Sequence, residues 1–231
     1  LTGRLTTDAA LNLHNKLIVR QMKKIFYIAM ACLTVGLFAS CTQYNFDDTG
    51  FANGKHETTM WDYFKGDKYN WELLCEMAER ADLIPLFQGT SRYGKDFTFF
   101  GPTSHSIRRY LYANGMEKVS DIPVSDCRTF ILNCVLPGRR VMLDDFKEGV
   151  KSSDPSTPVG KGGEMVQMAS GKQLWIYTFH ESYNNVPGAG PLRIHLVSPA
   201  TTQTTDVASC NIETLTGIVH SLDYNFNLTD F

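Results

Sequence analysis

The sequence has 231 residues, 43% of them hydrophobic and 20% charged, a balance typical of one globular domain with at most a tail. The formal net charge is −2, but it is uneven: 17 basic and 23 acidic side chains follow from Cys41 onward, a net charge of −6 there. An acidic surface without a Lys/Arg stripe repels phosphate backbones, which excludes nucleic acid as a partner.

The first feature along the chain is an export signal. Met22, Lys23 and Lys24 form a positively charged start, and residues 25–38 follow as a run of fourteen without a charge. This run is too short to span a bilayer, which needs roughly 18–20 apolar residues, but it has the length of a signal-peptide core. We therefore interpret residues 1–21 as a mis-assigned upstream extension and residues 22–40 as a signal peptide.

The residues after this run predict a lipid anchor. Ala39 and Ser40 are small, and Cys41 follows them, an order that resembles a bacterial lipoprotein signal in which the cysteine is acylated and becomes the first mature residue. One position departs from that pattern, because Phe38 stands three residues before the cysteine where leucine is usual. We expect lipidation at Cys41 and a flexible tether over residues 41–57.

The first half of the remaining chain predicts helices around one buried strand. A short helix is expected around residues 60–64, and a longer one begins at Asn70 as N-cap, with an inward face of Trp71, Leu74, Cys75, Ala78 and Ala81. Residues 96–100 have no helical period and predict a buried strand, after which Thr103 or Ser104 caps a helix that ends near Gly115. Another helix fits residues 125–135, with Phe130, Ile131 and Cys134 inward and Pro137-Gly138 after it.

The C-terminal part changes to β-structure. Residues 151–163 are rich in Gly, Pro and Ser and predict a flexible loop. Short β-prone segments follow at residues 164–169, 173–179, 193–197 and 218–222, separated by turn residues. Helices first and strands later predict an α+β fold with N-terminal helices packed on a sheet of short strands.

Two segments resemble the conserved boxes of fasciclin domains. Residues 97–107, which include Phe99, Pro102 and Thr103, resemble the first box, and residues 211–223, which include Gly217, His220 and Asp223, resemble the second. Pro137-Gly138 stands where the family has a Pro-Gly turn. The resemblance covers residues 58–231 and implies a single fasciclin-like domain in which these residues do structural work.

The resemblance also implies a role in adhesion or extracellular binding. Two positions that the family ties to that role differ here, since Cys134 replaces its histidine and Asn211 precedes Ile212 where the family has Asp-Ile. Integrin recognition is therefore not carried over to this chain. A fold-level resemblance indicates architecture more than chemistry.

No motif for catalysis or metal binding is evident. The six histidines are scattered, and we expect His220 to be a half-buried structural residue and His180-Glu181 to lie on a loop surface rather than act as an acid/base pair. The carboxylates Asp144, Asp145 and Glu148 lack the spacing of an EF-hand and predict a solvated face. We expect no cofactor, no metal and no catalytic residue. Cys75, Cys127, Cys134 and Cys210 could form disulfides or remain buried thiols; we favour thiols.

Aromatic residues offer the main candidate for ligand binding. Trp175, Tyr177 and Phe179 alternate, so they share one face of a strand, and Tyr183 follows in the next loop. Core packing is the favoured interpretation, and the alternative is an exposed sugar-stacking platform of Trp175, Tyr177 and Tyr183. The sequence thus predicts a non-catalytic, lipid-anchored outer-membrane protein that binds extracellular protein or polysaccharide. The alternatives are a glycan-binding accessory of a polysaccharide-uptake system and a hydrolase that uses the Asp144 region.

Overall fold

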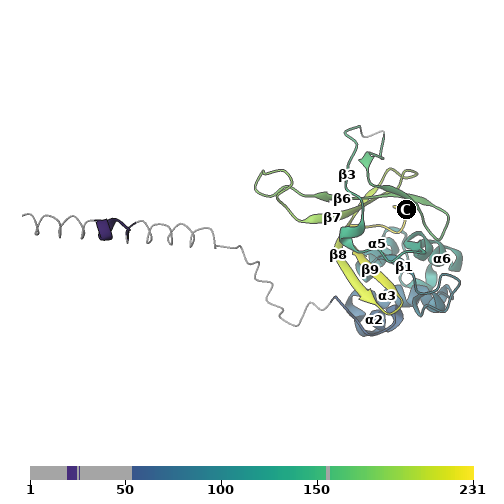
Figure 1. Cartoon of the computed structure of the whole chain (residues 1–231). Coiled ribbons are helices and arrows are strands. Elements are labelled where there is room, and N and C mark those ends of the chain that lie inside the picture. The colour runs from purple at the N-terminus through teal and green to yellow at the C-terminus, as the bar shows by residue number, and fades with distance from the viewer. Residues whose placement is uncertain (1–19, 25, 27–53, 155–156) are drawn as a thin grey trace, which may run out of the picture. The chain divides into compact units, whose positions relative to one another are not determined.

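A computed structural model describes residues 20–24, 26, 54–154 and 157–231 (Figure 1). The chain divides into two compact units, residues 1–51 and 52–231. In the first unit the described residues are helical and exposed, and the expected acylation site Cys41 and most of the expected signal peptide lie outside the described residues. No helix in the described part of the chain is long and apolar enough to cross a membrane.

The second unit begins with three helices, α2 (Met60–Gly66), α3 (Lys68–Arg80) and α4 (Ile84–Phe87). The short helix expected near residue 60 is confirmed as α2. The expected N-cap of α3 is wrong: the helix begins after Asp67, whose side chain accepts from the backbone N–H of Asn70. Asp67 is therefore the N-cap. Asn70 lies one turn inside the helix, where its side-chain amide donates to the Asp67 carboxylate at 2.7 Å.

Two further helices flank the first buried strand. Strand β1 (Phe97–Gly101) leads into α5 (Ser104–Ala113), and α6 (Val124–Asn133) leads directly into β2 (Val135–Pro137). Thr103 is the N-cap of α5, as expected, but its hydroxyl makes no capping hydrogen bond and is buried without a partner. The Ser104 hydroxyl instead accepts from the backbone of Leu73 at 3.2 Å, which ties α5 to α3.

A seven-stranded sheet forms the rest of the unit, in the order β2-β1-β9-β8-β7-β6-β5. Its C-terminal strands are β5 (Glu164–Gln167), β6 (Gln173–His180), β7 (Leu192–Val197), β8 (Thr204–Thr214) and β9 (Gly217–Leu222). All pairings are antiparallel except that of β1 with β9, which is parallel. The α+β class predicted from the sequence is therefore confirmed.

Strand β8 is the longest of the strands that the sequence did not predict. It is the longest strand, with 11 residues, and it joins β7 on one side to β9 on the other. Two register shifts interrupt its pairing with β9, and Asn211 beside them has a positive φ of 61°. These irregularities break the two-residue alternation on which strand prediction depends.

Smaller elements complete the unit. Strand β3 (Gly149–Val150), just before the expected loop 151–163, pairs with β4 (Lys161–Gly162), which lies within it, as a separate two-stranded sheet. Residues 54–57, which were expected to belong to the tether, pair with β8 through the backbone. The Glu213 N–H donates to the Gly54 carbonyl oxygen at 2.7 Å, and the Glu213 carbonyl oxygen accepts from the His56 N–H at 2.8 Å. The ordered domain therefore starts before residue 58.

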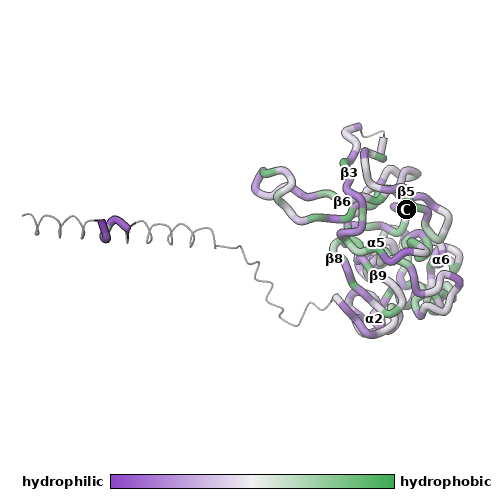
Figure 2. The backbone as a smooth tube through the Cα atoms, viewed as in Figure 1, coloured by the Kyte–Doolittle hydropathy of each residue, from purple (hydrophilic) through white to green (hydrophobic). Residues whose placement is uncertain are grey.

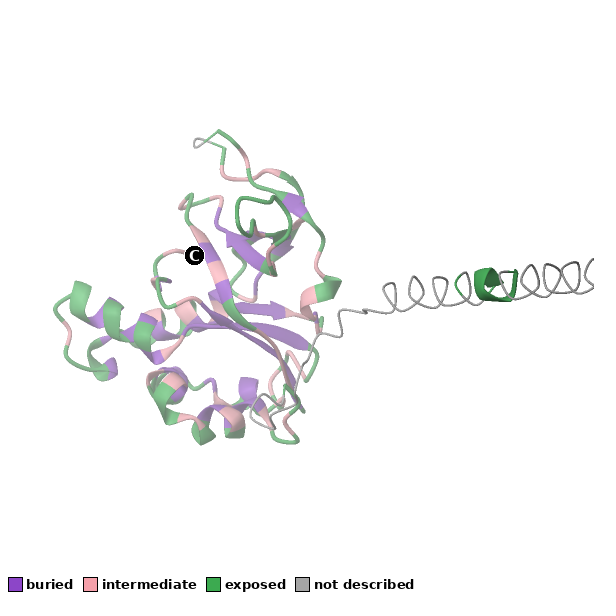
Figure 3. Ribbon diagram, turned by 90° about the vertical axis from the view of Figure 1, so that its left-hand side faces the viewer, coloured by how far each residue is buried: buried purple, intermediate pink, exposed green. Residues whose placement is uncertain are grey.

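One continuous core joins the helices to the sheet. Phe64 of α2 and Phe87 of α4 contact Phe99 of β1, with ring centroids 5.8 and 5.0 Å apart. All five residues of β1 and all six of β9 are buried (Figure 3). Hydropathy follows burial, with hydrophobic segments across the middle of the unit and hydrophilic ones on its outer turns (Figure 2).

Candidate functional site

The two fasciclin-like boxes lie side by side in the sheet, on adjacent strands next to the edge strand β2. Strands β1 and β9 pair in parallel, with Phe99 opposite Val219 and Phe100 opposite His220. Gly217 opens β9 with a φ of +150°, and a Cβ there would lie 2.7 Å from the Phe97 carbonyl oxygen. These contacts hold two distant segments together, so they are scaffold contacts.

His220 is fully buried, not half-buried as expected, and both ring nitrogens are satisfied. Its Nδ1 accepts from the Asn211 N–H at 3.3 Å, so the proton lies on Nε2, which donates to Val141 O at 2.9 Å. Burial lowers the pKa of His220 to about 4, against the opposing effect of the Val141 hydrogen bond. A neutral ring that stacks on Phe100 is a structural residue.

The remaining family-motif residues also do local work. Gly138 follows β2 with a positive φ of 75°, which suits the turn after Pro137. The Asp223 carboxylate accepts from the Asn225 N–H at 2.8 Å and closes the turn after β9. Pro102, which follows β1 and precedes α5 in the sequence, is buried. Asp223 also lines a small cleft of about 230 Å³ together with Asp206 and Asp230.

Trp175 and Tyr177 are buried, at 1% and 3% exposure, which agrees with the core interpretation. Their rings stack with centroids 4.3 Å apart, and they form a small cluster with Val197, against which Val159 packs. The alternative prediction, that Trp175 and Tyr177 form a sugar-stacking platform exposed to solvent, is therefore wrong. Tyr183 is exposed at 63%, and its role in ligand binding stays a prediction.

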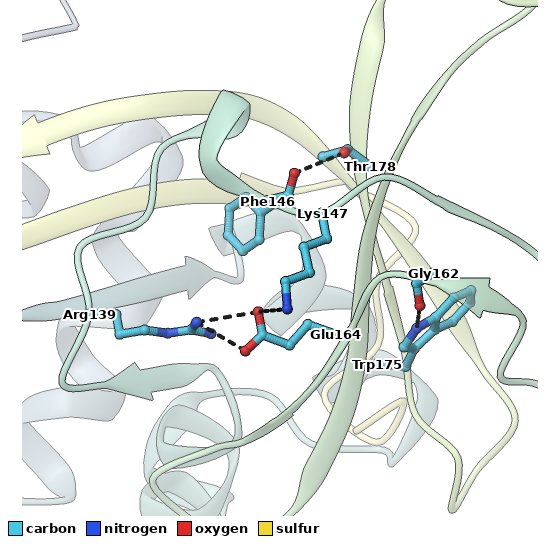
Figure 4. A network of polar contacts seen from close by, with 7 residues as sticks. All are labelled: Arg139, Phe146, Lys147, Gly162, Glu164, Trp175 and Thr178. Atoms are coloured by element: carbon cyan, nitrogen blue, oxygen red, sulfur yellow. Dashed lines mark hydrogen bonds and ion pairs between the residues drawn. The ribbon is translucent and has the colours of Figure 1, made fainter.

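The cover over this aromatic pair is the segment between η2 (Leu143–Asp145) and β5. Its carbonyl groups bind β6: Thr178 Oγ1 donates to Phe146 O at 3.4 Å, and Trp175 Nε1 donates to Gly162 O at 3.0 Å (Figure 4). An ion pair from Arg139 to Glu164 at 3.1 Å anchors its far end. The expected flexible loop is thus tied to the sheet in its described parts.

An open cleft of about 350 Å³ lies beside this cover, and it is the best candidate for a binding site. The hairpin of β6 and β7 provides half of its lining, and β3 with the residue after it and the start of β8 provide the rest. Its lining residues are Val150, Lys151, Tyr177, Phe179, Glu181, His195, Thr204 and Asp206. Its volume is at the lower end of the range of roughly 300–1,000 Å³ for ligand pockets.

His195 is the central polar group of this cleft. Its side chain is only 9% exposed, and its ring stacks on Tyr177 with centroids 4.9 Å apart. Nδ1 lies 2.7 Å from Asp206 Oδ1, while Nε2 lies 3.5 Å from Glu181 Oε1 and has no hydrogen-bond partner among the described residues. A buried imidazole nitrogen without a partner is unusual and indicates that something else can bind there.

The charges of the cleft follow from this arrangement. The hydrogen bond from His195 lowers the pKa of Asp206, with further lowering from the electrostatic interaction with His195, Arg193 and Lys151, although partial burial opposes it. Burial, together with the nearby Asp206 and Glu181 carboxylates, raises the pKa of Tyr177 to about 12. At neutral pH the Asp206 side chain is a carboxylate and the Tyr177 phenol is uncharged.

Exposed apolar side chains line part of this cleft and continue along the β6–β7 hairpin. Phe179 is 39% exposed and Val150 59%, and both line the cleft. The loop between β6 and β7 adds Tyr183 and Val186, at 63% and 55% exposure, and projects from the body of the domain (Figures 1 and 2). Several large exposed apolar side chains on one hairpin are typical of an interaction surface.

The Asp144 region does not form a site. Asp145 accepts from the Met142 N–H at 3.2 Å and so closes the turn of η2, and Asp144 is exposed. No three His, Cys, Asp or Glu side chains in the described ranges are grouped to hold a metal ion. The cleft that His195 lines together with Glu181 and Asp206 includes none of Asp144, Asp145 and Glu148.

The four cysteines of the folded unit are free thiols. Cys127 and Cys134 are buried and Cys75 and Cys210 are half-buried. Burial raises the pKa of all four thiols, to about 11 for Cys75 and Cys210. They are therefore protonated at neutral pH and poor nucleophiles.

Sequence reasoning missed the cleft because its partners are not neighbours in sequence. Glu181 does approach a histidine, but that histidine is His195 rather than the adjacent His180, whose Nδ1 lies 3.2 Å from Gly190 O. Asp206 lies in β8, which was not predicted at all. Only the register of three strands brings these side chains together.

No protein-family model matches the sequence, and no curated protein matches it. Among solved structures, the chain is similar to a FAS1 domain pair from the insect cell adhesion molecule fasciclin I, at 13% sequence identity and a TM-score of 0.49. The likeness covers 75% of this chain and 52% of that one, so the chain spans about half the length of the domain pair. At this identity and TM-score, the likeness by itself identifies neither the family nor the function of the chain.

Proposed function

We propose that the chain is a lipoprotein of the outer membrane of a Gram-negative bacterium, anchored through Cys41, whose fasciclin-like domain binds an extracellular protein or polysaccharide without catalysing a reaction. The anchor is supported by the order of the N-terminal signals, from Met22-Lys23-Lys24 through the apolar run to the small pair and the cysteine. More than one acyl chain on a lipoprotein cysteine would make that attachment firm.

The binding function is supported by one observation: the motif residues are buried in the core, whereas a polar cleft opens at the surface. The motif residues of the two boxes, such as Phe99, Gly217 and His220, are buried in strand pairing and packing. A cleft that combines a histidine with two carboxylates opens instead among β6, β7 and β8. A rigid scaffold with an accessible polar cleft fits a binding module.

Binding is favoured over catalysis by the composition of the cleft. Asp206 orients the His195 ring, as the carboxylate of a hydrolytic triad does, but neither serine nor cysteine lines the cleft beside it. The hydroxyl groups present are those of Thr204 and of the uncharged Tyr177. These side chains can orient a ligand, but the lining residues include no serine or cysteine that His195 could activate as a nucleophile.

The anchor is tested by metabolic labelling with an alkyne fatty acid in a Gram-negative host that expresses the full chain. We expect label on the wild type and on Cys32→Ala, which changes a cysteine inside the apolar run, and none on Cys41→Ala. Equal labelling of Cys41→Ala, or an unlabelled wild type, would refute the lipoprotein proposal.

The binding role is tested on intact cells that display the full chain. Adhesion to panels of immobilised extracellular proteins and polysaccharides is measured for the wild type and for cells that carry the empty vector. We expect selective adhesion to a ligand in one panel; polysaccharide ligands alone would favour the uptake-accessory alternative. Protease treatment of intact cells should remove the domain, and its complete protection would contradict surface display.

A further inference from the structure

We propose that the cleft between β3 and the β6–β7 hairpin binds the ammonium or guanidinium group of a basic side chain from a partner protein, and holds it between Glu181 and His195. This inference rests on the proposed binding function and names the chemistry that the site recognises. It follows from an unmatched pair of acceptors, from the charge balance of the cleft and from its apolar walls.

The unmatched acceptors follow from the protonation of His195. Because Asp206 is a carboxylate, it can only accept, so the His195 proton lies on Nδ1, 2.7 Å away. In a neutral ring Nε2 is then an acceptor, and it faces another acceptor, Glu181 Oε1, at 3.5 Å. Two acceptors at this distance, one of them buried, need a donor near both.

A donor can arrive in one of two ways. A second proton on His195 would convert the ring to an imidazolium that bridges Asp206 and Glu181. Alternatively, a ligand group in the open cleft donates to Nε2 and to the Glu181 carboxylate together. An ammonium has three donors and a guanidinium five, so either can satisfy both acceptors at once, whereas a sugar hydroxyl has one donor.

The charge balance favours a cation over a neutral donor. Asp206 is already compensated by the hydrogen bond from His195 and by the nearby Arg193 and Lys151. Glu181, 39% exposed at its side chain, lies 3.5 Å from His195 Nε2 and makes no ion pair with a lysine or arginine in the described parts of the chain. A bound cation would pair with this remaining carboxylate in a partly desolvated site, where such pairs are stronger than on an open surface.

The walls of the cleft suit the aliphatic part of a basic side chain. Phe179 and Val150 present exposed apolar surface at the opening, and Tyr177 lies beneath, stacked on His195. Methylene groups of lysine or arginine pack on such surfaces while the charged end reaches a polar partner. The exposed Tyr183 and Val186 further along the hairpin provide the apolar area expected at a protein interface.

The experiment uses the full chain in detergent, with the lysine analogue Nα-acetyl-lysine amide and the arginine analogue Nα-acetyl-arginine amide as probes. Nα-acetyl-norleucine amide and Nα-acetyl-citrulline amide are uncharged controls of similar shape. Binding is followed by calorimetry and by the ¹⁵N chemical shifts of the His195 ring, which distinguish an acceptor nitrogen from a protonated one. We expect dissociation constants of about 1 mM, the weak end of specific binding, for the charged probes.

The matched variants are Glu181→Gln in the cleft and Glu79→Gln on the exposed face of α3. Glu181→Gln should weaken the charged probes at least tenfold, because the glutamine amide supplies a donor to Nε2 itself and removes the negative charge. Glu79→Gln should leave binding unchanged, and it controls for the general loss of one acidic charge.

Three outcomes would overturn the inference. They are equal binding of charged and uncharged probes, a His195 ring that is already an imidazolium in the ligand-free protein at pH 7, and unchanged affinity in Glu181→Gln. Binding of neutral sugars in the cleft in place of the charged probes would also overturn it. In each case adhesion of intact cells can persist, so failure here is distinguishable from failure of the binding function.

Discussion

His195 and Asp206 are direct partners in the antiparallel register of β7 and β8, and their side chains meet at 2.7 Å on the same face of the sheet. Cross-strand partners hold their side chains at a fixed separation, so the register itself orients the imidazole. The unpartnered Nε2 is therefore aimed at the cleft by the backbone pairing, not by a mobile loop.

Replacement of Asp206 by asparagine should weaken this orientation and destabilise the fold slightly. The hydrogen bond from His195 holds the pKa of Asp206 below its usual value, so the charged form is favoured by folding. The side chain is 41% exposed, and solvent screening reduces the effect to about 1 kcal/mol. Urea unfolding of the wild type and Asp206→Asn at pH 7 measures this difference.

The pH dependence of that difference follows from the lowered pKa. Stabilisation by a carboxylate of lowered pKa is complete above its unfolded value of about 4 and is lost as the pH falls through its folded value. The gap between wild type and Asp206→Asn should thus shrink as the pH falls below about 4. Asp144→Asn, on the exposed turn of η2, should change stability by less than about 0.5 kcal/mol. A gap that grows as the pH falls below about 4 would contradict this account.

A second prediction concerns His220, whose side chain must be uncharged in the folded protein, whereas Asp206 must be charged. Its folded pKa of about 4 lies below the usual value of 6.5, so below pH 6.5 the unfolded chain binds a proton that the folded chain excludes. Stability should fall with a slope of up to about 1.4 kcal/mol per pH unit, by up to about 3 kcal/mol at pH 4. Above pH 7 this contribution does not change with pH.

Urea unfolding between pH 4 and 8 measures this loss. His220→Gln keeps a donor for Val141 and an acceptor for Asn211, but it cannot titrate, so its curve should be flatter by the His220 contribution. It should also cost about 1–3 kcal/mol at pH 7 through poorer geometry and packing. His105→Gln, exposed on α5, should retain the wild-type pH dependence. Parallel curves for His220→Gln and the wild type would show that His220 is not the buried neutral group.

The sequence predicted those parts of the fold that local patterns determine. The apolar period of α3 and the run at residues 96–100 were enough to place a helix and a buried strand. The cap of α3 was misplaced, because Asp67 and Asn70 are both good capping residues and only their mutual hydrogen bond decides between them. Thr103 was placed correctly, but its hydroxyl does not perform the expected capping.

The cleft was beyond such patterns, for a physical reason. Strand β8 is polar and bulged, so its 11 residues show no regular alternation, and without it Asp206 has no predicted neighbour. His195 likewise looked isolated, because Glu181 and Asp206 reach it across two different strand pairs. The burial of Trp175 and Tyr177 was favoured from the sequence, but the segment that covers them was expected to be flexible.

The thiols give a prediction about reactivity. Burial raises the pKa of Cys75 and Cys210 to about 11, so less than about one thiol in a thousand is ionised at pH 7.5. Iodoacetamide should label both slowly at pH 7.5 and faster as the pH rises toward 10. The buried Cys127 and Cys134 should react only after unfolding. Peptide mass spectrometry resolves the four sites; rapid labelling of Cys134 in the native protein, or disulfide-linked peptides, would contradict the structure.

Gly163 tests how tightly the cover segment lies on the aromatic pair. It has a φ of +60°, and a Cβ there would lie 2.5 Å from Trp175 Nε1 and 2.8 Å from the Ile176 carbonyl oxygen. Gly94 has a similar φ of +64°, but a Cβ there has open space around it. Gly94→Ala therefore measures the cost of the backbone conformation alone, about 1 kcal/mol. Gly163→Ala should cost about 1–3 kcal/mol more, because the methyl group must displace the cover from Trp175. Thermal unfolding measures the loss of stability in each variant. The near-ultraviolet circular dichroism of the protein, to which Trp175 contributes, should change in Gly163→Ala only. Equal costs and unchanged spectra in both variants would mean that the cover does not pack closely on Trp175.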